Sequence, residues 1–274
     1  LNRAKENAMR QKRCVRILQR HHFASKLQRM STVCEVRNHP SRSKVSETCC
    51  LVKGSPEIVR TILSEDGVPN WYEATYQKLA EEGMRVLALA YKWCPPDAAS
   101  WSRHRVESDL QFAGFVAFSC IVRADSSTVI RALKESGHQV AMVTGDQPLT
   151  ALHVAKEVCI CNDDKSRAGL LLSVSEKKHV RWVPTSRNDR CSPIAFRASE
   201  MNELSRSNNL VVTEKALNAA LDQAGSDAEQ KLIWKNIDSI RVFARMSPQG
   251  KAKIVDALQV RLYLFYLLNY SLSH

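Results

Sequence analysis

The pattern of apolar and polar positions changes near residue 110. In the first part, short apolar runs bounded by polar turns are typical of strands, and longer segments have the spacing of helices. The predicted strands are 22–25, 30–33, 48–52 and 85–91. The predicted helices are 1–20, a segment that begins after Ser55, and 71–82, which Gly83 ends. The polar segment 38–46 predicts a hairpin loop between two of the strands.

In the second part, predicted strands and helices alternate, which is the pattern of a parallel α/β sheet. The predicted strands are 112–120, 139–143 and 240–244. The predicted helices begin at Asp125 and at Pro148, and further helices are predicted at 210–224, 227–234 and 249–258. The stretch 160–209 is rich in Arg, Ser and Asn and is interpreted as an insertion or loop region. After Gln259 the composition shifts to Tyr and Leu, which indicates a divergent apolar tail over 259–274.

The positive charge of the chain is concentrated near its beginning. The formal net charge is +12, and residues 1–60 hold fourteen Lys or Arg against four Asp or Glu, a net of +10. A basic face attracts nucleic acid, anionic lipid or a polyphosphate ligand. No helix-turn-helix, zinc-finger or RNP-like pattern accompanies the charge, so no nucleic-acid partner is predicted and a solvated basic helix is favoured.

The nine cysteines are dispersed and include no Cys-x-x-Cys pair, so no disulfide partner is predicted and a reducing environment fits. Cys159, Cys161 and His153 could supply zinc ligands, but without a second ligand pair the pattern favours buried free thiols, and no metal site is predicted. The apolar run 262–268 is far shorter than the ~20 residues that cross a bilayer. Because Leu1 begins the chain within a predicted helix, we expect a piece of a longer protein, either soluble or extramembrane.

The segment Thr144-Gly145-Asp146 is the sharpest local signal of function. It lies between a predicted strand and a predicted helix, where parallel α/β sheets bind anions and nucleotides. Glycine permits close approach of the backbone, and Asp146 is interpreted as a polar organiser or as a helix N-cap. Arg245 and Lys251 flank a second turn of the same kind, where both could reach a phosphate.

Three residues of the first part are further candidates for ligand contacts. Lys53, in the block Lys53-Gly54-Ser55-Pro56-Glu57, lies between a strand and a helix and could contact a phosphate or an adenine ring, although a surface lysine is the simpler interpretation. Phe23 could stack on adenine or belong to the core. Arg85 opens a strand and could contact a phosphate or form an edge salt bridge.

Four blocks in this order resemble the cytosolic part of the P-type ATPases. They are Lys53-Gly54-Ser55-Pro56-Glu57, Arg85-Val86-Leu87-Ala88-Leu89-Ala90-Tyr91, Met142-Val143-Thr144-Gly145-Asp146 and Val242-Phe243-Ala244-Arg245-Met246-Ser247-Pro248. The segments His21-His22-Phe23-Ala24-Ser25, Arg29-Met30-Ser31 and Thr144-Gly145-Asp146-Gln147-Pro148-Leu149-Thr150-Ala151 resemble the fifth class, endoplasmic-reticulum subgroup. That subgroup is associated with cation transport and with moving transmembrane helices of misplaced proteins.

The resemblance implies a nucleotide-binding domain over 1–110, with an antiparallel sheet in an α+β fold. It implies an incomplete phosphorylation domain over 111–258, with a parallel sheet of the haloacid-dehalogenase-like Rossmannoid type. Phe23 then corresponds to the adenine-stacking position, Lys53 with Gly54 to the lysine of the adenine pocket, and Arg85 to the arginine that bridges the nucleotide phosphates. Gln28 replaces a lysine that is usual in the family, which weakens phosphate attraction.

In the second domain, the resemblance places Thr144, Gly145 and Asp146 near the γ-phosphate of ATP, and Arg245 and Lys251 beside the aspartyl-phosphate. The expected ligand is therefore ATP, with Mg²⁺ in the parent protein. The parent is expected in the endoplasmic-reticulum membrane, with this region facing the cytosol and acting with membrane helices and an actuator domain.

Two motifs of the family do not occur in the sequence: the Asp-Lys-Thr-Gly-Thr that holds the phosphorylated aspartate, and the Thr-Gly-Asp-Gly-x-Asn-Asp that binds magnesium. We therefore expect ATP binding without turnover, because no acceptor for a phosphoenzyme is present. A haloacid-dehalogenase-type phosphatase is an alternative, but it requires an Asp-x-Asp motif that the sequence lacks. A non-catalytic basic interaction fragment is the other alternative.

Overall fold

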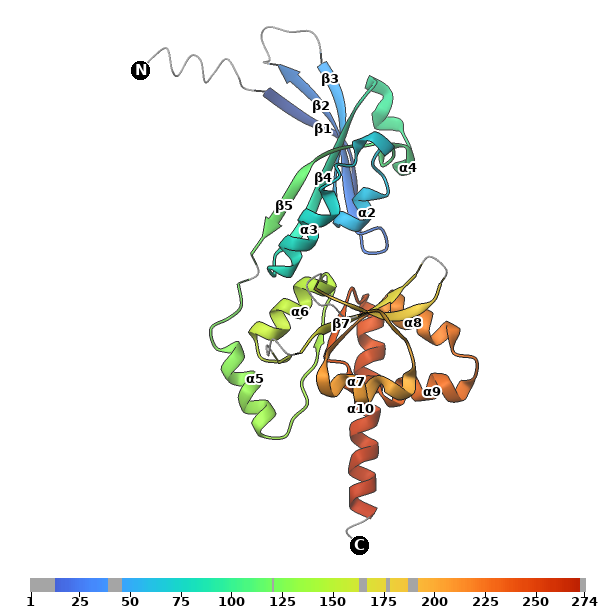
Figure 1. Ribbon diagram of the computed structural model, residues 1–274. Coiled ribbons are helices and arrows are strands. Elements are labelled where there is room, and N and C mark those ends of the chain that lie inside the picture. Colours follow the sequence, from blue (N-terminus) through green and yellow to red (C-terminus); the bar gives the residue numbers. More distant parts are fainter. Residues whose placement is uncertain are drawn as a thin grey trace. The chain divides into compact units, whose positions relative to one another are not determined.

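The computed structural model describes residues 13–38, 46–119, 121–162, 167–175, 178–186 and 192–271. Its contacts divide the chain into two compact units (Figure 1). The first unit comprises Leu1–Leu79 and Val86–Phe118. The second comprises Ala80–Arg85 and Ser119–His274.

The first unit contains a five-stranded sheet with the strand order β1-β2-β3-β4-β5, in which β1 to β4 are antiparallel. The strands are β1 (Arg13–Ala24), β2 (Arg29–Asn38), β3 (Ser46–Gly54), β4 (Arg85–Cys94) and β5 (Gln111–Phe118). The helices are α2 (Pro56–Arg60), α3 (Tyr72–Glu81) and α4 (Arg103–Val106), with 3₁₀ turns η1 (Glu65–Gly67) and η2 (Pro96–Ser100). The antiparallel sheet with helices agrees with the α+β fold expected for this part.

Apolar side chains on one face of this sheet pack against the short helical segments. Val33 and Cys50 are fully buried against Ala98 of η2 and Val106 of α4. Near α3, Tyr72 makes ring contacts with Phe112 and Phe115 of β5, and its hydroxyl donates to the carbonyl oxygen of Pro56 at 2.8 Å. These contacts attach α2 and α3 to the last strand of the sheet.

The second unit contains a mixed six-stranded sheet with the strand order β6-β11-β10-β7-β8-β9. The first four are parallel, and β8 and β9 continue the sheet in antiparallel fashion. The strands are β6 (Met142–Val143), β7 (Gly169–Val174), β8 (Val180–Pro184), β9 (Ile194–Ala195), β10 (Asn209–Thr213) and β11 (Val242–Ala244). The helices are α5 (Ser126–Glu135), α6 (Pro148–Glu157), α7 (Met201–Ser207), α8 (Glu214–Gln223), α9 (Asp227–Lys235) and α10 (Pro248–Ser271), with 3₁₀ turns η3 (Ala198–Glu200) and η4 (Ile237–Ser239).

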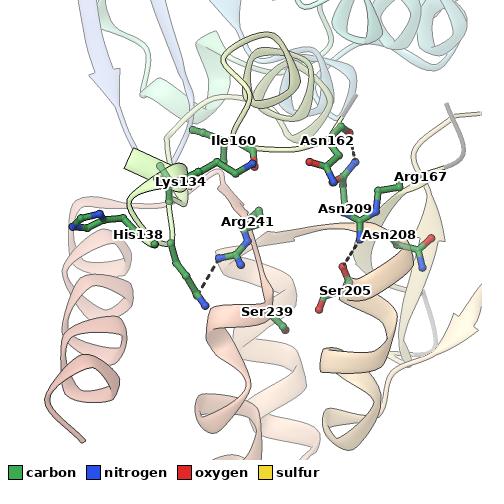
Figure 2. Close-up of a pocket in the computed structure, with 13 residues that line it drawn as sticks. Lys134, His138, Ile160, Asn162, Arg167, Ser205, Asn208, Asn209, Ser239 and Arg241 are labelled. Carbon is green, nitrogen blue, oxygen red and sulfur yellow. Dashed lines mark hydrogen bonds between the residues drawn. The ribbon is translucent and has the colours of Figure 1, made fainter. Parts of the chain in front are cut away.

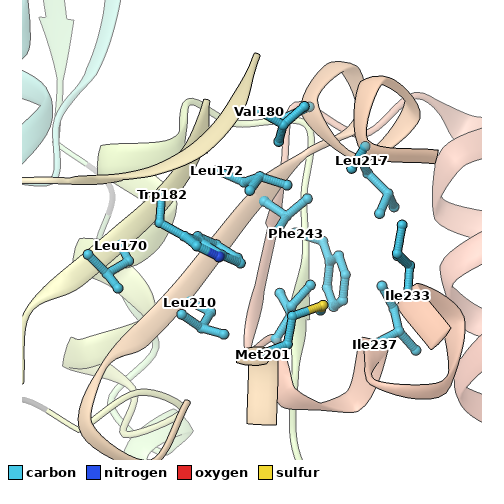
Figure 3. Packing of buried hydrophobic residues seen from close by; sticks show 14 of the residues in the cluster. Leu170, Leu172, Val180, Trp182, Met201, Leu210, Leu217, Ile233, Ile237 and Phe243 are labelled. Carbon is cyan, nitrogen blue, oxygen red and sulfur yellow. The ribbon is translucent and has the colours of Figure 1, made fainter. Parts of the chain in front are cut away.

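Helices cover both faces of the parallel part of this sheet. Leu210 and Phe243 point into a cluster that includes residues of α7, α8, α9 and α10 (Figure 3). Their neighbours Val211 and Val242 point to the opposite face, where they pack against α6. This alternation places successive strand residues on opposite faces, and both faces are apolar because both are covered.

The helix predicted over 1–20 is wrong for its described part, because residues 13–24 form β1. Val15 and Ile17 alternate with polar residues, and β1 pairs with β2 from Arg13 to Ala24. Pairing with β2, the next strand along the chain, supplies the backbone hydrogen bonds, so the partner strand decides the conformation. Residues 1–12 and most of the predicted hairpin loop lie outside the described residues.

The region expected to be irregular, 160–209, contains β7, β8, β9 and α7 in its described part. The helix predicted over 210–224 is also wrong at its start, because Leu210, Val211 and Val212 form the buried strand β10 before α8 begins at Glu214. A short apolar run does not distinguish a buried strand from a helix. Here the position between β7 and β11 selects the strand.

Two other predictions are corrected at element boundaries. The strand predicted at 112–120 is β5, which joins the first sheet and not the parallel one, and Cys120 lies outside the described residues. The helix predicted at 249–258 is α10, which continues to Ser271 through most of the segment interpreted as a tail. Within the described part of the chain, no helix is both long and apolar enough to cross a membrane.

We predict that Phe243→Ala destabilises the second unit by about 3–5 kcal/mol, because Phe243 is fully buried and its removal leaves a cavity. Val255→Ala is the control, because Val255 is 45% exposed on α10 of the same unit. This substitution should lower the free energy of unfolding much less. Urea denaturation followed by circular dichroism, with hydrogen exchange of peptides from β10 and β11, measures both effects. Equal losses for the two variants would contradict the assignment of the core.

Candidate functional site

The turn between β1 and β2 packs against the end of β3. Ser55 donates its backbone N–H to the carbonyl oxygen of Gln28 at 3.0 Å, and its hydroxyl donates to Gln28 Oε1 at 3.2 Å. A Cβ atom at Gly54 would lie 2.7 Å from Cβ of Arg29, so glycine is required for this close approach. Ser55 is the residue before α2, as predicted, but its hydroxyl contacts the turn and does not cap the helix.

The same packing brings three predicted residues, Phe23, Lys53 and Gly54, to one end of the sheet, where β1 and β3 end. Ala24, Arg29, Gly54 and Ala88 are register partners across β1 to β4. Phe23 and Lys53 each lie one residue from this row, and both side chains are exposed, Phe23 by 61%. Phe23 is therefore not a core residue. Its aromatic ring and the ammonium group of Lys53 are both exposed at this end of the sheet.

A buried carboxylate holds the chain on both sides of Phe23. Glu107, at the end of α4, accepts hydrogen bonds from Arg29 Nε at 2.6 Å, from the Ser31 hydroxyl at 2.9 Å and from Arg103 Nε at 2.9 Å. Arg103 also donates to the carbonyl oxygens of His22 and Arg29, at 3.2 and 3.0 Å. The cluster therefore fixes the residue before Phe23 and the first residue of β2.

Burial of Glu107 acts to raise the pKa of its carboxyl group. The hydrogen bonds from Arg29, Ser31 and Arg103, with the charge of Arg29, outweigh burial and hold this pKa below its ordinary value of 4.5. The Glu107 side chain has no exposed surface, whereas those of Arg29 and Arg103 are 17% and 26% exposed. No local pattern predicts this cluster, because Ser31 and Arg29 lie 76 and 78 residues from Glu107 in the sequence.

In the second unit, the loops after β6 and β11 are joined through the backbone. Arg245 donates its N–H to the carbonyl oxygen of Asp146 at 2.9 Å, and Met246 donates to that of Thr144 at 3.0 Å. The Thr144 hydroxyl donates to Asp146 Oδ2 and accepts from the Asp146 N–H, both at 3.1 Å. The structure thus brings together two predicted segments that are about 100 residues apart in sequence.

Asp146 is a polar organiser of this loop and not a helix N-cap. Gln147 is the residue before α6, and its side chain makes no capping bond. Asp146 Oδ1 also lies 3.8 Å from Nε of Arg85, which belongs to the segment Ala80–Arg85 of this unit. Gly145 is exposed, and a Cβ atom there would meet nothing closer than 3.8 Å.

Glu214 is a residue of this edge that the sequence analysis missed. Its carboxylate accepts from the N–H and the hydroxyl of Ser247, at 2.7 and 2.8 Å, and it packs against Gly250 at the start of α10. A carboxylate at a helix N-terminus is favourable because of the helix dipole. Lys251, in the first turn of α10, is exposed. Only the adjacency of β10 and β11 brings Glu214 to this helix, so no local pattern could identify it.

The cysteines considered for zinc have other surroundings. Cys159 accepts from Arg131 Nε at 3.3 Å, His153 contacts the carbonyl oxygen of Glu81, and burial raises the pKa of the Cys161 thiol to about 11. Among the described residues, no group of three His, Cys, Asp or Glu side chains could hold a metal ion. In the first unit, the Cys50 and Cys94 sulfur atoms are 3.2 Å apart as free thiols.

Comparison with known proteins identifies the family. A family model described as P-type ATPase, cytoplasmic domain N, matches residues 3–125. The chain is 36% identical over 254 residues to a probable manganese-transporting ATPase of Arabidopsis thaliana. The aligned region covers 89% of this chain and 19% of that protein. It is 32% identical over 261 residues to an endoplasmic reticulum transmembrane helix translocase of Schizosaccharomyces pombe, covering 93% of this chain and 20% of the relative.

The chain belongs to the P-type ATPase family. These relatives confirm the fifth-class membership that the sequence blocks predicted. A polyamine-transporting ATPase 13A3 of Mus musculus is 28% identical over 252 residues, covering 86% of this chain and 20% of the relative. The chain spans about one fifth of the length of these curated relatives.

We predict that Glu107→Gln destabilises the first unit at pH 7 by about 3 kcal/mol, because it removes the negative partner of two arginines from a buried cluster. Since the pKa of Glu107 is lowered by folding, its contribution is present above pH 4.5 and is lost as the pH falls below that value. The variant should therefore lose less stability than the wild type on acidification through this range.

Hydrogen exchange of peptides from β1 and β2, measured at neutral and acidic pH, tests this prediction. Glu73→Gln is the control, because Glu73 and Arg60 form an exposed pair whose expected contribution is only ~0–1 kcal/mol. Exchange rates in Glu107→Gln that match those of Glu73→Gln at every pH would overturn the role assigned to Glu107.

Proposed function

We propose that the first unit binds ATP at the sheet edge formed by Phe23, Lys53 and Gly54. The observation that carries the proposal is an exposed aromatic ring and an exposed lysine near the same end of the sheet, on β1 and β3. The turn between β1 and β2 is held there by Arg103 of the Glu107 cluster and by the close approach of Gly54 to Arg29. An exposed ring stacks on adenine, and an ammonium group attracts phosphate. Gln28, whose side chain accepts from Ser55, contributes no charge there. The match to cytoplasmic domain N supports this assignment.

For the second unit, we propose a partial phosphorylation domain of the haloacid-dehalogenase-like type. Thr144, Gly145 and Asp146 follow β6, and Arg245 follows the adjacent parallel strand β11. The carboxyl ends of adjacent parallel strands are where α/β sheets bind phosphates. In this proposal Arg245 and Lys251 attract the phosphoryl group, Arg85 contacts nucleotide phosphates, and Asp146 orders the loop through Thr144.

We further propose that the whole protein is an ATP-driven membrane transporter that cycles through an aspartyl-phosphate. The relatives named as endoplasmic reticulum transmembrane helix translocases support that membrane and a helical protein segment as the transported substrate. Membrane helices and an actuator domain would be the partners of this region. In the parent, Mg²⁺ would neutralise phosphate charge, and the described residues form no group of three ligands that would hold it here.

The 274 residues should not hydrolyse ATP, because they lack the family's acceptor aspartate motif. Incubation with γ-phosphate-labelled ATP and Mg²⁺, followed by acid quenching, should leave no label on the chain. A covalent acyl phosphate on the purified chain would contradict this proposal and would identify an acceptor outside the known motif.

We predict that Lys53→Ala and Phe23→Ala each weaken binding of a fluorescent ATP analogue by roughly tenfold or more, because a charge-assisted contact or a base stack is lost. Lys78→Ala, an exposed lysine of α3, and Trp93→Ala, a 57% exposed aromatic residue of β4, are the matched controls. Titration of each variant, with circular dichroism to verify folding, measures the effect. No saturable binding by the folded wild-type chain would overturn the proposal.

The non-catalytic basic interaction fragment remains the second candidate, favoured by the net charge of +10 in residues 1–60. The two candidates differ in their dependence on the base. An adenine site requires ATP to displace the analogue much better than tripolyphosphate does, whereas a polyanion surface makes the two competitors equivalent. Equivalent displacement would favour the interaction fragment.

A further inference from the structure

A cavity of about 430 Å³ lies in the second unit at the amino ends of its parallel strands (Figure 2). Val140 precedes β6, Arg167 precedes β7, Asn209 begins β10 and Arg241 precedes β11, and all four line the cavity. The loops of Thr144 and Arg245 follow the opposite, carboxyl ends of β6 and β11. The cavity is therefore separate from the candidate phosphate loops, and its volume is in the range of small-molecule sites.

The lining of this cavity is positively charged. Lys134, Arg167 and Arg241 contribute three cations and His138 an imidazole ring, whereas none of the thirteen described lining residues is Asp or Glu. Asn162, Asn208, Asn209, Ser205 and Ser239 supply neutral polar groups. A concave surface with charge of one sign concentrates ligands of the opposite sign.

Among the described residues, the hydrogen-bond acceptors of the three cations are neutral. Lys134 Nζ donates to the carbonyl oxygen of Cys159 at 3.0 Å, and Arg241 Nη1 donates to Gln139 Oε1 at 3.3 Å. Arg167 Nη2 donates to the carbonyl oxygens of Ser205, at 3.2 Å, and Arg206. These bonds orient the cationic groups without neutralising them, and each guanidinium retains further N–H donors.

The electrostatic surroundings of the nearby Cys161 contain the same excess of positive charge. The thiol of Cys161 is 3% exposed, and burial raises its pKa to about 11. The charges of Lys156, Arg241, Lys134 and Arg167 all oppose that increase, so all four act on the same buried atom. The three lining cations come from three separate segments of the chain, and all of them line the same cavity.

We propose that this cavity binds a small phosphate ester that carries several negative charges. Guanidinium groups form paired hydrogen bonds with phosphate oxygens, and the neighbouring lysine adds a point charge. The Asn and Ser side chains at the amino ends of the strands suit the hydroxyl groups of such a ligand. The ligand is either a soluble phosphate ester or the headgroup of an anionic lipid.

Calorimetric titration of the full chain with inorganic pyrophosphate and with inositol trisphosphate tests the proposal. We expect saturable binding of inositol trisphosphate that Arg241→Gln, Arg167→Gln and Lys134→Gln each weaken roughly tenfold, because each removes a charge-assisted contact. Affinity should also fall as salt concentration rises. Thermal unfolding without ligand identifies any variant that does not fold, and Arg167→Lys keeps the charge if Arg167→Gln fails.

Matched controls separate this cavity from general surface charge. Arg181→Gln on β8 and Lys253→Gln on α10 remove exposed cations of the same unit outside the lining and should leave the affinity unchanged. Asp163 and Asp164 lie between lining residues in the sequence but outside the described residues. Replacing both with Asn should maintain or strengthen binding, and a loss would overturn the proposal by pointing to a bound cation.

Flotation of the chain with phosphatidylcholine vesicles, with and without a phosphoinositide, distinguishes the two sources of the ligand. Association that requires the phosphoinositide and Arg241 assigns a lipid headgroup, whereas inositol trisphosphate binding without vesicle association assigns a soluble ester. If the folded wild-type chain neither binds inositol trisphosphate nor associates with the vesicles, the proposal is overturned. It is also overturned if Arg181→Gln weakens binding as much as the lining variants do. Lys53→Ala should not alter this binding, so its outcome is independent of the proposed ATP site.

Discussion

The buried carboxylate of Glu107 is the interaction on which the candidate nucleotide site of the first unit depends. Removing a carboxylate from water is costly, and here Arg29, Arg103 and Ser31 compensate with three hydrogen bonds. Arg103 extends the cluster to the carbonyl oxygen of His22, directly before Phe23. An exposed aromatic ring near the end of an edge strand is normally free to move, and this cluster fixes the backbone next to Phe23. Binding therefore requires less ordering of the turn.

The second unit positions its candidate residues by a different means, the geometry of a parallel sheet. Adjacent strands end at the same edge, so the loops of Thr144 and Arg245 meet and exchange backbone hydrogen bonds. Arg245 has a φ of 52°, a conformation that is uncommon for a non-glycine residue and is held by those bonds. The opposite edge of the same strands forms the cationic cavity. One sheet thus presents two edges of different charge: carboxylates and cations together at the carboxyl ends of the strands, and cations without carboxylates in the cavity lining at the amino ends.

Much of the local structure follows from the sequence. The segments of α2, α3, α5, α6 and α9 were predicted from capping residues, proline and glycine positions and apolar spacing. Prediction was wrong for β1 and β10, where the same apolar residues suit a helix or a strand. In both cases pairing with neighbouring strands decides, because it supplies the backbone hydrogen bonds of a strand. The polar stretch 160–209 was misjudged because β7 and β8 are short and separated by polar turns.

By itself, the sequence determined the family and the candidate residues, because the short blocks around Lys53, Arg85, Thr144 and Arg245 occur in a characteristic order. Only the tertiary structure decided which of them meet. Glu107, Glu214 and the cationic cavity each combine residues distant in sequence, and their effect depends on distance and burial. Charge interactions and hydrogen bonds act through space over a few ångströms, so a linear pattern cannot specify them until the strands have paired.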